Sequence, residues 1–174
     1  MQYQKLVIAL NKSFEKIDQS SDIVFVCLGT DQISGDAFGP IVGHELKNKL
    51  NNVTVMGRIN CPITYPKIEK IEQEIYANFK NPYIICIDAA LSKTIEKGQI
   101  VVEEKATKIG RALGKKVKNI GNLSIKGVVG ATQEDCSKNM ETLINAPIEL
   151  ILEMAKMVTN GIADVYLSKN MGKI

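Results

Sequence analysis

Short apolar runs alternate along this chain with segments whose apolar residues recur at the helical period. The runs are rich in β-branched residues and bounded by turn residues, a pattern typical of buried strands. They predict strands at residues 23–28, 53–56, 82–88, 98–103 and 123–129. The helical pattern predicts helices at residues 6–17, 39–50 and 67–79, a helical segment from 133 and a last helix from Pro147.

Helices that follow strands in this way indicate βαβ crossovers. We therefore expect an α/β fold with three layers, in which a mainly parallel or mixed sheet is covered by helices on both faces. No repeat, low-complexity tract or linker interrupts residues 1–174, and 45% of the residues are hydrophobic. The sequence thus predicts a single domain with one substantial core.

Two acidic segments follow buried runs directly. Residues 23–28 lead into the glycine-rich loop 29–40, which contains Asp36, and residues 83–87 lead into Asp88-Ala89-Ala90. Parallel sheets bind their ligands at the carboxyl ends of the strands. We therefore expect Asp36 and Asp88 to face one another across a cleft, with small residues leaving room beside them.

A facing pair of carboxylates can perform acid–base chemistry. If the two groups share a water molecule, repulsion and partial burial raise one pKa and leave the other group ionised, which separates a general acid from a general base. The alternative is that Asp36 or Asp88 caps a helix or turn, which is the commoner use of an isolated loop aspartate.

Charge and composition exclude several function classes. The net charge of +3 is too small to argue for nucleic acid, and the basic stretch 105–118, expected to be a loop, has no interleaved aromatic residues. This stretch is either solvated surface or a binding site for an acidic partner. The four cysteines form no C-x-x-C pair, and the chain has neither a leader-like terminus nor a membrane-spanning run. We expect an unprocessed, soluble, cytoplasmic protein with reduced thiols.

Familiar cofactor and metal motifs are incomplete. Residues 110–116 are one residue short of a phosphate-binding loop and lack its serine or threonine, and no G-x-G-x-x-G occurs. The only histidine, His44, begins half of a zinc-protease helix and has no second histidine to complete it. A cysteine nucleophile such as Cys61 would have only His44 as its base. We expect no cofactor and no metal, which leaves Asp36 and Asp88 as the catalytic candidates.

Three motifs together resemble a known family. They are Gly29-Thr30-Asp31 with Ser34-Gly35-Asp36-Ala37-Phe38-Gly39-Pro40, then Cys86-Ile87-Asp88-Ala89-Ala90, and Gly110-Arg111-Ala112-Leu113-Gly114-Lys115 before Gly121-Asn122-Leu123-Ser124-Ile125-Lys126-Gly127. In order and spacing they resemble the YyaC-type sporulation proteins, relatives of the germination protease of endospore formers. The likeness covers roughly residues 22–130.

The resemblance implies a phosphorylase/hydrolase-like fold shared with the hydrogenase maturation endopeptidases. In the germination protease, aspartates of the two acidic motifs are the catalytic candidates, and they match Asp36 and Asp88. In the maturation endopeptidases the matching acids bind a metal together with a histidine farther along the chain. No histidine follows His44 in this sequence.

The leading hypothesis is a sporulation-associated peptidase in which Asp36 and Asp88 share a water molecule. We expect Asp31 and the backbone N–H groups from Gly35 to Gly39 to orient the substrate or stabilise an oxyanion, and Lys115 to contribute to binding. The resemblance implies a protein or peptide substrate such as the small acid-soluble spore proteins. The rival is a non-catalytic protein that holds an acidic or peptide partner in the same cleft.

Overall fold

Five strands form the central sheet, in the order β2-β1-β3-β7-β4. The computed structural model describes residues 1–110 and 114–170. The strands are β1 (Asp22–Cys27), β2 (Thr54–Met56), β3 (Pro82–Ser92), β4 (Ile100–Glu103) and β7 (Leu123–Ala131). All neighbouring pairs are parallel except β4 and β7, which are antiparallel, so the sheet is the mixed one that the sequence allowed.

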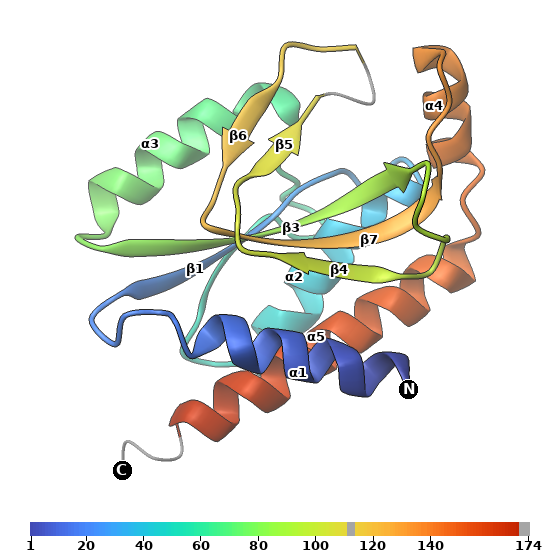
Figure 1. Cartoon of the computed structure of the whole chain (residues 1–174). Coiled ribbons are helices and arrows are strands. Elements are labelled where there is room, and N and C mark those ends of the chain that lie inside the picture. Colours follow the sequence, from blue (N-terminus) through green and yellow to red (C-terminus); the bar gives the residue numbers. More distant parts are fainter. Residues whose placement is uncertain (111–113, 171–174) are drawn as a thin grey trace.

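Helices cover both faces of this sheet, as predicted (Figure 1). One face carries α1 (Gln2–Phe14), α2 (Phe38–Lys49) and α5 (Ile148–Asn170). The other face carries α3 (Ile68–Asn78) and a two-stranded ribbon of β5 (Thr107–Ile109) and β6 (Lys118–Ile120). Helix α4 (Cys136–Ile144) follows β7, and single 3-10 turns, η1 (Gly35–Ala37) and η2 (Tyr65–Lys67), precede α2 and α3.

The strands are apolar on both faces because each face packs against its own core cluster. Phe25 and Ile85 belong to the cluster beneath α1, α2 and α5, whereas Val24 and Ile84 belong to the cluster beneath α3. A strand buried on both sides loses the alternation of polar and apolar residues. This is why β1 and the first part of β3 appear in the sequence as continuous hydrophobic runs.

Three expectations about boundaries are wrong. Strand β3 continues past Asp88 to Ser92, because residues 89–92 also pair with β7. The stretch 105–118 is not simply a loop, because it contains β5 and the start of β6, held to the sheet by a buried hydrogen bond from Thr107 Oγ1 to Ser124 Oγ (2.8 Å). The first helix ends at Phe14, earlier than the apolar pattern indicated.

The expectations about thiols and membrane-spanning segments can be compared with the structure. All four cysteines are free; Cys27 and Cys86 are buried in the sheet, whereas Cys61 and Cys136 are exposed. Among the described helices, none combines the length and the apolar character needed to cross a membrane.

We predict that Gly39→Ala destabilises the fold. A Cβ at Gly39 would lie 2.0 Å from the carbonyl oxygen of Leu28, directly after β1, and 3.0 Å from that of Ile87 within β3, and both are backbone atoms. In an open helical site the change would stabilise the protein by about 1 kcal/mol, but here overpacking should cost about 3 kcal/mol in the free energy of unfolding. Urea denaturation measures the difference.

Gly161→Ala in α5 is the matched control. A Cβ there meets only the side-chain ends of Leu10 and Leu6, at 3.2 and 3.3 Å, which can shift. Equal stability changes in the two variants would contradict the close contact between α2 and the strand ends.

Candidate active site

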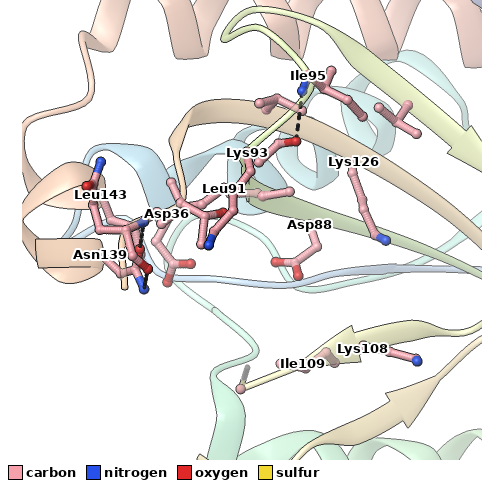
Figure 2. A pocket seen from close by; sticks show the side chains of 18 of the residues that line it. Asp36, Asp88, Leu91, Lys93, Ile95, Lys108, Ile109, Lys126, Asn139 and Leu143 are labelled. Atoms are coloured by element: carbon pink, nitrogen blue, oxygen red, sulfur yellow. Dashed lines mark hydrogen bonds between the residues drawn. The ribbon is translucent and has the colours of Figure 1, made fainter. Parts of the chain in front are cut away.

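A cleft of about 880 Å³ opens where β3 and β7 end, and both predicted aspartates line it. Its walls come from the sheet, from the β5–β6 ribbon and from α4. Among the lining residues are Asp36, Asp88, Ala89, Ala90, Leu91, Val101, Glu103, Lys105, Lys108, Ile109, Lys126, Val128, Asn139 and Leu143. In Figure 2 the carboxylates of Asp36 and Asp88 point into the same space above the ribbon.

The backbone of the loop after β1 holds Asp36 in place. Gly29 has a φ of +123°, a conformation that favours glycine, and a Cβ on it would lie 2.0 Å from the Asp36 carbonyl oxygen. The backbone N–H of Thr30 donates to that same oxygen at 3.2 Å. Asp36 itself sits in the single turn η1, directly before α2, and its side chain is half-buried.

Asp88 is held by the sheet rather than by a turn. It lies within β3 and pairs in register with Lys126 of β7, and a bulge shifts the register between Ala90 and Leu91. The small residues Ala89 and Ala90 line the cleft beside it, as expected from the sequence. The pairing of β3 with β1 ends one residue earlier, at Ile87, so β7 alone pairs with Asp88, and the half-buried side chain of Asp88 lines the cleft.

The two carboxylates perturb one another. The pKa of Asp88 is raised to about 7. Burial is the largest cause and repulsion from Asp36 adds to it, whereas Lys126 and the backbone N–H of Ala89 lower the pKa. Burial also raises the pKa of Asp36, against the opposing effects of the Thr30 backbone N–H and the Lys115 charge. Such a pair can hold one proton between two acids near neutral pH, which is the arrangement that general acid–base catalysis needs.

A lysine that the sequence analysis did not single out lies beside the acids. Lys126 Nζ donates to Glu103 Oε2 at 2.9 Å, and Lys105 Nζ donates to Glu103 Oε1 at 2.8 Å. The side chain of Lys126 is only 22% exposed. Its one sequence signal is the charge itself, placed in the otherwise apolar strand Leu123–Ala131.

The other predicted binding residues lie apart from the cleft lining. Asp31 is exposed in the loop after β1. Gly35 and Gly39 are buried: a Cβ on Gly35 would come within 2.8 Å of the Leu143 carbonyl oxygen, and Gly39 packs against strand ends. Their close packing positions η1 and α2, and their contribution to substrate binding stays a prediction.

The basic stretch divides between two sides of the ribbon. Lys105 and Lys108 line the cleft, whereas Lys115 and Lys118 stack over the ring of Tyr65, with their nitrogens 5.0 and 4.7 Å from its centroid. Lys118 also pairs with Glu69, at 2.9 Å. Lys115 therefore acts on Asp36 by its charge while contacting Tyr65, and its part in substrate binding stays a prediction. Residues 111–113, including Arg111 of the basic stretch, lie outside the described residues.

The donor set does not fit the metal site of the maturation endopeptidases. Within residues 1–110 and 114–170, no three His, Cys, Asp or Glu side chains cluster in a way that could hold a metal ion. His44 lies half-buried on α2 and is not among the residues lining the cleft. The carboxylates of the cleft lining are accompanied by ammonium groups, among them Lys105, Lys108 and Lys126, and a metal ion is repelled by ammonium because both are positively charged.

The chain was compared with solved structures. The [NiFe] hydrogenase maturation protease HycI from Thermococcus kodakarensis KOD1 superposes with a TM-score of 0.59 over 90% of this chain and 97% of its own, at 20% identity. The maturation protease HybD from Thermococcus kodakarensis covers 79% of this chain and 97% of its own at a TM-score of 0.42 and 13% identity. The likeness to HycI shows that the chain has the fold of a maturation protease.

Sequence relatives define the family. The uncharacterized protein YyaC of Bacillus subtilis (strain 168) is 31% identical over 144 residues, which cover 81% of this chain and 68% of YyaC. Residues 1–161 match the family described as protein of unknown function, DUF1256, and the chain belongs to that family.

Proposed function

We propose that the protein is a peptidase in which Asp36 and Asp88 activate a water molecule. The observation that carries this proposal is that the two carboxylates face one cleft and that burial and repulsion raise the pKa of Asp88 to about 7. An acid with such a pKa keeps a proton at neutral pH and can still release it.

The two acids take different roles. Asp36, which the Thr30 N–H and Lys115 help to keep ionised, accepts a proton from the water as the water oxygen bonds to the carbonyl carbon of the peptide. Asp88 then gives its proton to the amide nitrogen as the carbon–nitrogen bond breaks. The products are a carboxylic acid and an amine, and the proton on Asp36 returns to Asp88 or to solvent before the next cycle.

The choice of a peptide bond rests on the fold, which is that of a hydrogenase maturation protease. Because one fold supports many activities, the site residues must carry the rest of the argument. The sporulation role, a cytoplasmic or forespore location and small acid-soluble spore proteins as substrates rest on the resemblance to the germination protease. An unfolded protein or peptide is the substrate class that all these considerations share.

We predict that Asp36→Asn and Asp88→Asn each lower peptide hydrolysis by about 100-fold or more, because each removes one proton-transfer step. The assay follows cleavage of unfolded proteins and of small acid-soluble spore proteins by mass spectrometry. Glu153→Gln, which changes an exposed carboxylate on α5 that does not line the cleft, is the control and should retain activity. Full activity in both cleft variants would instead favour the non-catalytic binding function.

The pH dependence of hydrolysis should follow the two acids. We expect kcat/KM to fall above about pH 7, where Asp88 loses the proton it must donate, and to fall again in acid, where Asp36 becomes protonated. Initial rates from about pH 4 to about pH 9 give the profile. A rate that keeps rising through neutral pH into alkali would contradict Asp88 as the acid.

Stability should show the same perturbation without any substrate. The pKa of Asp88 is higher in the folded state than the value of about 3.9 in an unfolded chain, so its stabilising contribution is complete below about pH 4 and is lost as pH rises to about 7. We therefore expect Asp88→Asn to raise Tm relative to wild type at about pH 8, with the difference vanishing near about pH 4. Thermal denaturation at both pH values checks this, and a pH-independent difference would argue against the raised pKa.

A further inference from the structure

Addition of water to a peptide carbonyl places negative charge on the carbonyl oxygen, and two acids alone do not stabilise it. Enzymes meet this charge with fixed donors or cations inside a water-poor site. In the related maturation endopeptidases a metal ion shares the matching acids, but the described donors of this chain do not fit a metal. Several lysines line the cleft, and Lys126 is the register partner of Asp88 among them.

Lys126 lies directly across the sheet from Asp88. The two residues are register partners on the parallel strands β7 and β3, so their side chains leave the same face of the sheet from strands about 4.8 Å apart. Figure 2 shows the Lys126 nitrogen beside Asp88, on the side away from Asp36. Asp36, Asp88 and Lys126 all line the same cleft.

Glu103 holds the ammonium in position. It lies on β4 two residues from Val101, the register partner of Lys126, and it accepts from Lys126 with one oxygen and from Lys105 with the other. An ammonium group has three donors, and Glu103 engages one of them. Lys126 lines the cleft with a side chain that is 22% exposed, so solvent screens its charge only in part.

We propose that Lys126 is the third member of the site, and that its ammonium donates to the carbonyl oxygen of the scissile bond and stabilises the negative charge that forms there. The inference rests on the proposed peptidase function. In this chain a fixed lysine then supplies a positive charge beside the two acids. Lys126 is thus a catalytic residue, while Glu103 is a positioning residue that acts through it.

The simpler role for Lys126 is structural: it pairs with Glu103, and its positive charge reduces the cost of placing the negative charge of Asp88 in the cleft. Several charged or titratable groups meet around Asp88: Asp36 from η1, Lys126 from β7, Lys108 from β5, Glu103 from β4 and the Cys86 thiol from its own strand. A structural lysine would change stability when removed, whereas a catalytic one must change kcat.

The test compares Lys126→Met, Lys126→Arg and the control Lys70→Met. Lys70 lies on α3 with a side chain that is 80% exposed, so its replacement removes the same charge far from the cleft. We expect Lys126→Met to lower kcat by about 100-fold with little change in KM, and Lys126→Arg to restore part of kcat. Circular dichroism confirms that each variant is folded, and Lys70→Met should match wild type.

A titration of Asp88 that needs no substrate completes the experiment. In carboxyl-detected NMR of the full chain, the pKa of Asp88 should rise further in Lys126→Met, because an opposing positive charge is lost, and should be unchanged in Lys70→Met. Hydrolysis should also withstand EDTA. Retained kcat in Lys126→Met, an unchanged Asp88 titration, or activity that EDTA abolishes and a divalent cation restores would each overturn the inference.

These outcomes separate the inference from the proposed function. If Asp36→Asn and Asp88→Asn are inactive while Lys126→Met is fully active, the aspartate mechanism stands and Lys126 has no part in it. If both aspartate variants are active, the peptidase proposal itself is wrong, and the Asp88 titration still decides whether Lys126 and Asp88 interact.

Discussion

The site depends on the close contact between the start of α2 and the backbone of β3 and of the residue that follows β1. Gly39 rests against the carbonyl oxygens of Leu28 and Ile87, and Gly29 allows the Asp36 carbonyl to approach where any side chain would block it. These contacts bring the turn that carries Asp36 down onto the sheet, next to the strand that carries Asp88. A looser contact would separate the carboxylates and remove the repulsion that raises the pKa of Asp88.

The proximity of Asp36 and Asp88 also lowers the stability of the fold. Two buried acids that repel one another favour protonation, and Lys126 only partly compensates them. Sites that are unfavourable for stability often serve function, because strongly perturbed acids are the ones that can exchange protons near neutral pH. The charges of Asp36 and Lys126 both act on Asp88, so replacing either residue changes the pKa of Asp88.

Much of this arrangement was predictable from sequence. The apolar runs before Asp36 and Asp88 indicated adjacent parallel strands, and the carboxyl ends of such strands meet at one edge of a sheet. Lys126 was not predictable, because its place opposite Asp88 depends on the register between β3 and β7. The β5–β6 ribbon was missed for a similar reason: its strands have three residues each, and a tertiary hydrogen bond from Thr107 holds them to the sheet.

The position of the ribbon in the chain has a consequence for how the family can diversify. Glu103 and Ser124 are paired neighbours on β4 and β7, so residues 104–122 leave the sheet and return to it at the same place. Such an excursion can grow, shrink or be exchanged without moving the strands on either side, since the cost of closing a longer loop rises slowly with its length. Asp88 lies on the sheet and Asp36 on the turn before α2, whereas the facing wall of the cleft belongs to this excursion, so changes in one segment can reshape the cleft while both acids remain where they are.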